Sequence, residues 1–465
     1  MVKRPNMSRR RFLQACCAGA TSTTLVSTFA SLASSTALAS SANDYRALVC
    51  ILLAGGNDSF NMLVPNEDAT YAEYQTARTD LALERNALLG INPSGVDTRA
   101  YGLHPQMPRI KALFDSQRAA FLANVGTMVE QYNGVAPDYN ATNLPLGLYS
   151  HADQIGQWQT GLPDARSIEG WGGRMSDLLR TLNNSPHASM GYSIDSSSVY
   201  LAGTQTSGYT ISNQAEAPNI DFYRDDGWEL PRVLTRTMDN QLAQLYGNAI
   251  TQTLASRTRE VIDSNIAFSE AIDQAPEFTT EFAEDQFSQS MRAITKTIAA
   301  RELLGMKRQS FFVTIGGWDN HDELLLNHTR LLGWLDSGIG SFQEAMAEIG
   351  TEQMVTTFTT SDFARTLTSN GRGSDHGWGG NHIVVGGAVN GGQIFGEYPS
   401  LSLNNNPLHH DTFRGNYLPT TSTDEYFGEI ATWFGVSASD LSYVLPNVGR
   451  FYSPDSGLPI GFLSA

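Results

Sequence analysis

Two glycine-rich segments of the chain carry side chains that are well suited to bind a divalent metal ion. In each segment, Asp and His residues follow soon after an apolar run. Carboxylate oxygens and imidazole nitrogens are ligands that zinc, manganese and related ions accept, and glycines allow a loop to fold several ligands around one point. The sequence therefore predicts a metal site with the candidate ligands Asp319, His321, Asp362, Asp375, His376 and His382.

The elements that must position these ligands are short buried strands. Residues 45–53, 310–315 and 354–360 are β-rich apolar runs, and each is followed by a polar loop. Because open α/β folds place their sites at the C-terminal edge of parallel strands, the three loops should meet at one edge. The loop after the first run adds Asp58 as a further candidate ligand. Each Asp alone could cap a helix, but three at one edge favour a metal site.

Strand-like and helical segments alternate along the chain, which predicts an α/β fold with a doubly wound, mostly parallel sheet. Residues 40–465 are long enough for one elaborated domain of this kind. A β insertion is expected at about 192–217 and a helical insertion at about 228–275, both lying over the C-terminal edge of the sheet as a lid or an oligomer contact. The expected strands are 45–53, 119–126, 310–315, 354–360 and 383–389, and the expected helices are 105–116, 151–160, 286–306, 321–349 and 423–435.

Hydrolysis at a metal centre also needs a nucleophile, and Ser150 with His151 is the candidate catalytic pair. Ser150 precedes a helix-like segment, where the partial positive charge of the helix N-terminus would favour an ionised hydroxyl. Coordination to the metal would lower the pKa of that hydroxyl further. Ser150 could instead cap the helix, and Ser59 is a competing nucleophile. His151 could be a ligand, an acid for the leaving group, or neither.

The first 39 residues have the pattern of an export signal. Ser8–Gln14 contains a twin-arginine motif, and an Ala, Ser, Thr and Leu stretch then leads to a small-residue cleavage site at 37–39. The apolar part is too short and too rich in Ser and Thr to remain in a bilayer, so no stable membrane span is expected. We therefore predict a twin-arginine signal peptide over 1–39, the twin-arginine translocase as a partner, and a periplasmic or secreted mature protein.

The acidic composition excludes some classes of partner. The formal net charge is −17 at pH 7, and loss of residues 1–39, which hold five basic and no acidic residues, would bring it to −22. Such a protein repels nucleic acid and anionic lipid, so no nucleic-acid partner is expected. Cys50 would be the only cysteine of the mature chain. It could form no internal disulfide, and it is expected to pack in the core.

Several motifs taken together resemble a bacterial family called domain of unknown function 1501. The resemblance runs from about residue 45 to the end of the chain, and the family is placed in the alkaline phosphatase and sulfatase superfamily. That superfamily uses one or two metal ions and a Ser, Thr or Cys-derived nucleophile on a doubly wound sheet. The motifs are 52–61, 102–105, Ser150–His151, 158–161, 170–174, 318–321, 362–382, 418–421 and 433–435.

The resemblance implies roles for the residues that come first along the chain. Asp58 would resemble the superfamily's first-strand metal ligand. Ser150 would resemble the nucleophile, which sulfatases place about ten residues before a Thr-Gly pair. Asp319 and His321 would resemble the Asp and His of one metal position, although the superfamily usually spaces them more widely.

The last segment departs from the superfamily pattern at one position. Asp362 matches the Asp of a Ser-Asp-His-Gly motif, but the His of that motif is Phe363 here. Either His376, arriving with Asp375 after a short insertion, replaces it, or one metal position is lost. His382 would resemble the late His that closes the first metal site.

The expected function is that of an exported metal-dependent hydrolase of a phosphate or sulfate ester. One or two divalent ions are implied, with zinc as the first choice and manganese, calcium or magnesium as alternatives. Two ions could clamp the attacking and leaving oxygens, and Arg174, Arg365 and Arg372 could bind the remaining oxygens of the anionic substrate. The alternative is a non-catalytic exported protein of the same fold in cell-surface or polysaccharide assembly. Converging carboxylates, which repel one another without a cation, favour the enzyme.

Overall fold

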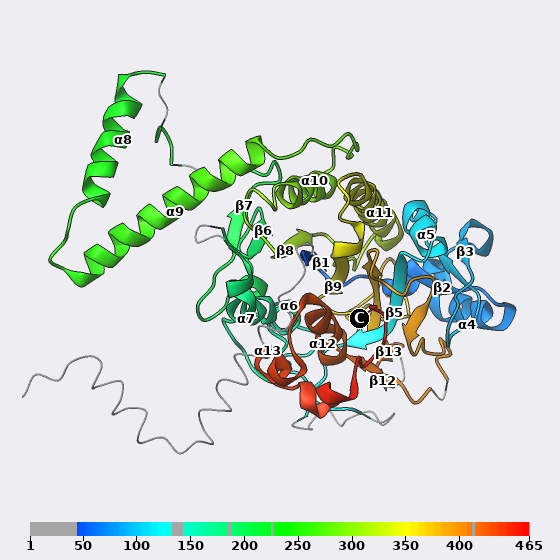
Figure 1. Cartoon of the computed structure of the whole chain (residues 1–465). Helices are drawn as coiled ribbons and strands as arrows, with labels where there is room; N and C mark the ends of the chain where they lie inside the picture. Colours follow the sequence, from blue (N-terminus) through cyan, green and yellow to red (C-terminus); the bar gives the residue numbers. More distant parts are fainter. Residues whose placement is uncertain are drawn as a thin grey trace, which may run out of the picture. The chain divides into compact units, whose positions relative to one another are not determined.

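The computed structural model describes residues 44–132, 143–184, 188–218, 220–224, 227–404, 406–411 and 414–464 (Figure 1). From Tyr45 onward these residues belong to one compact unit. The signal peptide predicted over 1–39 lies outside the described residues. Within the described part of the chain, no helix combines the length and the apolar character that a membrane crossing needs.

The centre of the fold is a mostly parallel sheet. In the described residues it contains nine strands in the order β11-β5-β10-β9-β1-β8-β6-β7, with β14 beside β5. Every pairing is parallel except those of β10 with β5 and β9, so the prediction of a mostly parallel sheet is confirmed. The strands are β1 (Arg46–Leu53), β5 (Ala119–Gly126), β6 (Gly191–Ile194), β7 (Tyr209–Ile211), β8 (Arg308–Ile315), β9 (Val355–Ser361), β10 (Gly380–Val385), β11 (Ile394–Gly396) and β14 (Thr421–Ser422).

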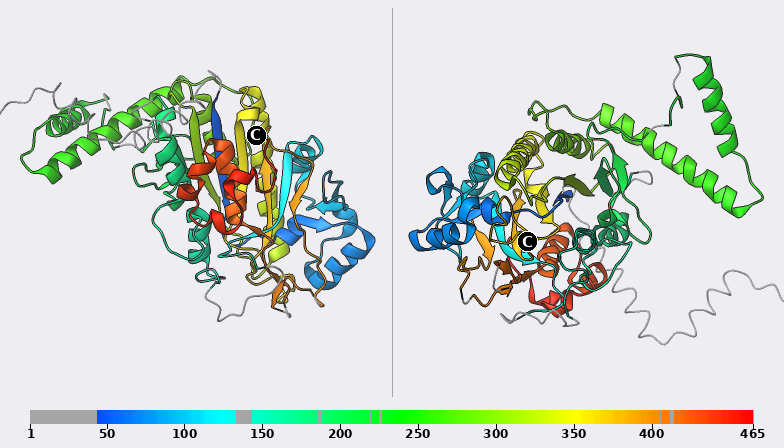
Figure 2. Two further views of the ribbon diagram at one scale, coloured as in Figure 1. Left: turned by 60° about the horizontal axis from the view of Figure 1, so that its bottom comes forward. Right: turned by 180° about the vertical axis from the view of Figure 1, so that it is seen from behind.

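Helices cover both faces of this sheet (Figures 1 and 2). Alternate residues of β1 face opposite sides, so Val49 and Ile51 join one hydrophobic core while Leu48 and Leu52 join the other. The first core is closed by α5 (Pro108–Asp115), α10 (Gln286–Ala299) and α11 (Leu324–Glu348). The second is closed by α6 (His151–Thr160), α7 (Trp171–Leu179), α12 (Thr423–Phe434) and α13 (Leu441–Val444).

Smaller elements complete the unit. The short helix α3 (Ser59–Met62) and then α4 (Asp68–Arg78) follow β1, and a three-stranded sheet beside them contains β2 (Leu63–Pro65), β3 (Leu89–Ile91) and β4 (Tyr101–Leu103). Near the C-terminus, β12 (His409–Asp411) pairs with β13 (Asn416–Tyr417). The segment expected as a β insertion contributes β6 and β7 to the main sheet, and the expected helical insertion forms α8 (Glu229–Leu242) and α9 (Ala249–Asp273).

Three neighbouring strands end level with one another. Leu53 of β1 pairs with Ile315 of β8 on one side and with Ser361 of β9 on the other, and all three strands run in the same direction. The loops that leave these strands therefore start side by side at the C-terminal edge of the sheet, as the sequence predicts. The glycines at the end of β1 permit this close approach, because a Cβ on Gly55 would lie 2.3 Å from the backbone nitrogen of Asp319.

Candidate metal centre

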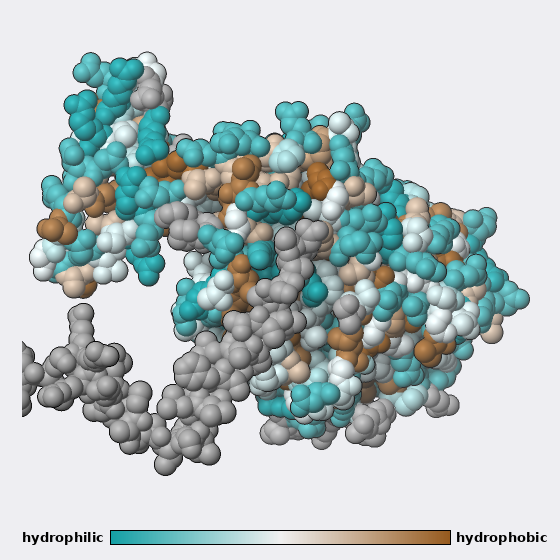
Figure 3. All heavy atoms as spheres, viewed as in Figure 1, coloured by the Kyte–Doolittle hydropathy of each residue, from teal (hydrophilic) through white to brown (hydrophobic). Residues whose placement is uncertain are grey.

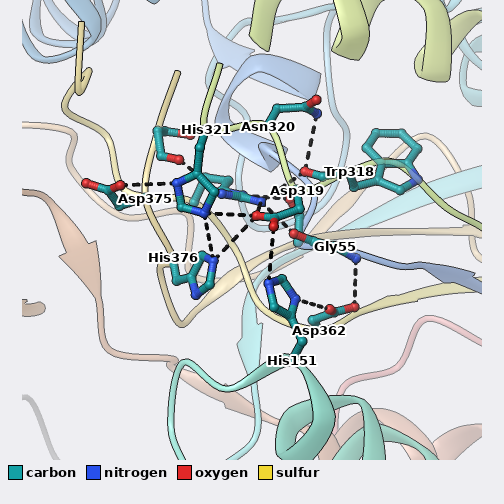
Figure 4. A network of polar contacts seen from close by, with 12 residues as sticks. Gly55, His151, Trp318, Asp319, Asn320, His321, Asp362, Asp375 and His376 are labelled. Carbon is teal, nitrogen blue, oxygen red and sulfur yellow. Dashed lines mark hydrogen bonds and ion pairs between the residues drawn. The ribbon is translucent and has the colours of Figure 1, made fainter. Parts of the chain in front are cut away.

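The loops after β8 and β9 and the first residue of α6 bring three histidines to the carboxylate of Asp319 (Figure 4). His321 Nε2 lies 3.0 Å from Asp319 Oδ1 and 3.0 Å from His376 Nε2. His376 Nε2 lies 3.4 Å from the same carboxylate oxygen. His151 approaches the second oxygen, with Nε2 3.5 Å from Oδ2. Among these, His151, Asp319 and His376 offer ligand atoms that all lie within 4.8 Å of one another.

Each of the three imidazoles is held from behind by an oxygen atom next to its Nδ1. Two of these oxygens belong to carboxylates and one to a backbone carbonyl, so we assign the ring proton to Nδ1 in all three. The pairs are His151 with Asp362 Oδ2 at 2.6 Å, His321 with Asp375 Oδ1 at 3.2 Å, and His376 with the carbonyl of Tyr149 at 2.9 Å. An oxygen behind the ring is the usual arrangement for a metal-binding histidine, because it orients the ring and raises its basicity.

The Nε2 atoms then present lone pairs toward one another. Two lone pairs that face each other at 3.0 Å, as those of His321 and His376 do in this tautomer, repel unless a metal ion or a proton lies between them. Ligand atoms bonded to one tetrahedral ion at about 2.0–2.2 Å lie roughly 3.3–3.5 Å apart. The distances from the three Nε2 atoms to Asp319 and from His321 to His376, 3.0 to 3.5 Å, are close to that spacing, and the ligand atoms of His151, Asp319 and His376 lie within 4.8 Å of one another. The residues present therefore fit a divalent ion.

Solvent and a substrate can reach this group. The exposed fractions of the side chains are 35% for His151, 45% for Asp319, 44% for His321 and 23% for His376. Asp362 and Asp375, which contact the Nδ1 atoms of His151 and His321, differ in exposure. The side chain of Asp362 is almost fully buried, and that of Asp375 is 32% exposed. Burial raises the pKa of Asp362, while hydrogen bonds from His151 and from the amide of Gly55 oppose that shift.

Arg365 links the loops that carry the site. Its buried guanidinium donates to the carbonyls of Gly55, Gly56, Trp318 and Ser374, and it pairs with Asp319. Burial raises the pKa of the Asp319 carboxyl, but the hydrogen bond and charge of Arg365 outweigh burial and hold that pKa below its usual value. The sequence suggests that Arg365 binds oxygens of the substrate, whereas the five contacts that its guanidinium makes here are all with other residues of the protein. It is a positioning residue that holds the carboxylate of Asp319 in place.

Phe363 stands where the superfamily pattern has a histidine, and it packs against two of the imidazoles. The ring of His376 lies 4.3 Å from that of Phe363, and the ring of His151 lies 4.8 Å from it, measured between centroids. His376 thus reaches the neighbourhood of the missing histidine. Burial lowers the pKa of His376, and the nearby charge of Arg365 lowers it further, so this imidazole is neutral at neutral pH.

Asp58 does not join the group, contrary to the sequence-based prediction. Its carboxylate forms a fully buried ion pair with Arg78 of α4. Arg78 also donates to the carbonyls of Thr366 and Leu367, each at 3.0 Å, so it ties the loop after β1 to the loop after β9. Asp58 therefore supports the loops that carry the site.

His382 also lies outside the group, although the sequence predicts it as a ligand. It is on β10, where alternate side chains face the second core, and its ring packs 4.8 Å from Trp158 and 6.0 Å from Tyr426. Burial lowers the pKa of His382 to about 3. Asp362 and Asp375, which the sequence also predicts as ligands, contact the Nδ1 atoms of His151 and His321 instead. The ligand atoms that remain together among the described residues lie around one point, which suits one ion better than two.

The predicted nucleophile caps a helix. Ser150 is the N-cap of α6, and its hydroxyl accepts from the amide of Asp153 at 3.5 Å, which is the alternative that the sequence left open. The hydroxyl of Ser59 accepts from the amide of Asn381 at 2.9 Å and is buried. His151, by contrast, points at Asp319. Ser150 therefore keeps both roles that the sequence left open, as a cap and as a nucleophile, and a water molecule is a further candidate for the attacking group.

The remaining arginines proposed for substrate binding have partners within the protein. The buried Arg174 donates to the carbonyls of Val444, Glu169 and Thr160. Arg372 pairs with Asp322 at 2.8 Å on the surface.

Tyr149 holds His376 through its backbone, a role that no sequence pattern indicates. It has a φ of 73°, a conformation that costs energy for a residue with a side chain. Its hydroxyl bonds to His410 Nδ1 at 2.8 Å and Asn416 Nδ2 at 2.6 Å. These bonds anchor the ring of Tyr149, while its backbone conformation turns the carbonyl toward His376.

We expect Tyr149→Val to weaken metal binding by roughly tenfold or more, because a β-branched residue disfavours the positive φ and displaces the carbonyl behind His376. Tyr149→Phe keeps the same backbone preference and loses only the hydroxyl, so it should retain most of the affinity. Competition with a chromogenic chelator measures both affinities. Equal losses in the two variants would show that the carbonyl has no positioning role.

A family model described as "Protein of unknown function (DUF1501)" matches residues 45–441. None of the curated proteins matches the chain.

Several solved structures resemble the chain at low identity. PsFucS1 sulfatase from Pseudoalteromonas sp. is 11% identical, with a TM-score of 0.33 over 77% of this chain and 66% of that one. The lipoteichoic acid synthase LtaP from Listeria monocytogenes is 9% identical, with a TM-score of 0.31 over 80% and 74%. TAB5 alkaline phosphatase, in a mutant form, is 12% identical, with a TM-score of 0.25 over 72% and 89%. Sulfatases and an alkaline phosphatase are the classes that the sequence motifs suggested, but scores this low support no argument about the site.

Proposed function

The chain belongs to the DUF1501 family of proteins of unknown function, so its activity has to be argued from its own site, and we propose that it is a metal-dependent hydrolase of a phosphate or sulfate ester. The observation that carries the proposal is the convergence of three imidazole Nε2 atoms on Asp319, each ring held by an oxygen at Nδ1. Such an arrangement serves little purpose without a cation.

We propose a single divalent ion held by Asp319, His376 and His151 or His321. A set of donors rich in imidazole suits zinc and other late transition metals better than calcium or magnesium, which prefer oxygen ligands. When bound, such an ion supplies Lewis acidity that promotes attack by water on an ester. The protein contributes the fixed ring orientations and the ionised Asp319. A histidine that does not bind the ion could exchange protons with water or the leaving group through its Nε2.

A second candidate function is that of a non-catalytic protein of the same fold, with one structural metal at most, that acts in cell-surface or polysaccharide assembly. The observation in its favour is that Arg174, Arg365 and Arg372 all have partners within the protein. In both cases the acidic protein would act outside the cytoplasm after export by the twin-arginine translocase, a proposal that rests on the motif in residues 8–14.

Elemental analysis of the purified protein, followed by an activity screen, tests the proposal. We expect about one zinc or similar ion per chain, in keeping with one set of converging ligands. Chelation should remove any hydrolysis of aryl phosphates or aryl sulfates, and the same metal should restore it. Bound metal without activity on either ester would favour the non-catalytic protein. A chain that binds no divalent ion would refute the metal-dependent hydrolase and leave the non-catalytic protein.

A further inference from the structure

Exposed apolar side chains are concentrated on the hairpin of α8 and α9, which stands away from the sheet (Figures 1 and 2). Of the eighteen large hydrophobic side chains that are exposed among the described residues, ten lie between 220 and 261. Figure 3 shows apolar residues along the outer part of α9. Single exposed hydrophobic residues are common, but a concentration of this kind marks an interaction surface.

The apolar residues of α9 form one seam along the helix. Ile250, Leu254, Val261 and Phe268 are spaced by four, seven and seven residues, so they lie on one face. At the inner end, which is next to the main sheet, Phe268 is buried, and its ring lies 5.4 Å from that of Tyr209. At the outer end, the exposed fractions are 80% for Ile250, 66% for Leu254 and 57% for Val261. The outer half thus lacks the cover that the inner half has among the described residues.

We propose that a second copy of this chain covers the outer half, with the two α9 helices packed antiparallel about a two-fold axis. The seam positions Ile250, Leu254, Arg257 and Val261 are separated by four, three and four residues, and this spacing reads the same in both directions. An antiparallel pair of identical helices requires that property. The axis then passes between positions 254 and 257. Ile250 packs on Val261 of the partner, and Leu254 packs on the alkyl part of the partner's Arg257.

The charges beside the seam suit self-association. Arg257 pairs with Glu260 at 2.8 Å, and Arg259 pairs with Asp263 at 2.6 Å. Because each cation has an anion on the same helix, two copies can approach without strong repulsion. A membrane surface is a poorer occupant, since the chain carries a formal charge of −17 and anionic lipid would repel it.

The available apolar surface is of the right order for a dimer. Leu230, Val233 and Leu234 of α8, Trp228 before it and Leu245 after it are 39 to 94% exposed, and they add to the exposed apolar area of the hairpin. If each of these eight side chains loses about 60–100 Å² of accessible area, roughly 500–800 Å² is buried per copy, against about 800 Å² in a typical stable interface. We therefore expect a dimer of moderate affinity, independent of any bound metal.

Sedimentation of the purified protein over a range of concentrations tests the dimer. Leu254→Asp should raise the dimer dissociation constant by roughly tenfold or more, because the substitution places a charge at two symmetric positions near the axis. Leu326→Asp is the matched control, since Leu326 is 68% exposed on α11 and lies outside the hairpin. It should leave the constant unchanged. Arg257→Leu should lower the constant, because it removes the polar residue that faces Leu254.

Three results would contradict a dimer formed through α9. A wild-type protein that stays monomeric at all concentrations would refute it, as would a dimer that Leu254→Asp weakens no more than Leu326→Asp does. Monomeric protein that binds vesicles of phosphatidylglycerol through Leu254 would assign the seam to a lipid surface instead. Circular dichroism confirms that each variant is folded, so loss of the dimer cannot be mistaken for unfolding.

Discussion

Replacing Asp319 by Asn should weaken metal binding by at least about a hundredfold and abolish ester hydrolysis that depends on the ion. Asp319 is the residue that all three imidazoles face, and it contributes the only carboxylate in contact with their Nε2 atoms among the described residues. Loss of a group behind a ligand typically costs tenfold to a hundredfold in affinity, so loss of a ligand's charge should cost at least as much. Elemental analysis and chelator competition measure the change.

Asn at position 319 can still accept a hydrogen bond from Arg365, so the loops should remain folded. Asp322→Asn is the control, because Asp322 lies three residues away in the same loop and pairs with Arg372 on the surface. That variant should keep its metal and its melting temperature. Normal metal affinity in Asp319→Asn would remove Asp319 from the site and contradict the proposed centre.

Replacing Arg78 by Met should destabilise the protein by about 3–5 kcal/mol at neutral pH, the largest stability change that we expect for one substitution. The guanidinium of Arg78 is fully buried, and it provides the positive charge beside Asp58 as well as two hydrogen bonds to the loop after β9. Without it, the buried carboxyl of Asp58 has either to remain charged without its partner or to take up a proton. Urea denaturation measures the loss of free energy of unfolding.

The loss of unfolding free energy in Arg78→Met should grow as the pH rises. Burial already raises the pKa of Asp58 above its usual value, and Arg78 opposes that shift. Removal of Arg78 therefore raises this pKa further. A carboxyl whose pKa is higher in the folded state binds its proton more tightly there, so it favours folding at low pH and loses that contribution as the pH rises. Arg78→Met should be less harmful at pH 5 than at pH 8.

Two further variants distinguish loss of the buried Asp58–Arg78 ion pair from the effect of removing any arginine. Arg85→Met removes an exposed arginine whose partner Asp68 is also exposed, and it should cost less than about 1 kcal/mol. The double variant Asp58→Asn with Arg78→Met should recover part of the stability and most of the pH dependence, since no buried charge is left. A loss in Arg78→Met that does not change with pH would show that packing, and not charge, dominates.

The sequence alone was sufficient to predict most of the central strands and the edge of the sheet at which their loops meet. Apolar runs of strand length predicted β1, β5, β8 and β9 to within about two residues, because the burial of a parallel strand on both faces leaves a visible run of hydrophobic residues. The same reasoning brought Asp319 and Asp362 to one edge of the sheet, since parallel strands that pair in register end together. Residue chemistry then indicated a metal site there.

Only the tertiary structure decided the role of each candidate. Asp58 and Asp319 both follow a strand in the central sheet, but Asp58 meets Arg78 of α4 while Asp319 meets three imidazoles. His382 has the right chemistry, yet its place on β10 turns it into the core. The carbonyl of Tyr149 reaches His376 across 227 positions of the chain. Local periodicity determines where strands and helices form, whereas partners from distant segments determine which side chain is neutralised, buried or left facing a common point.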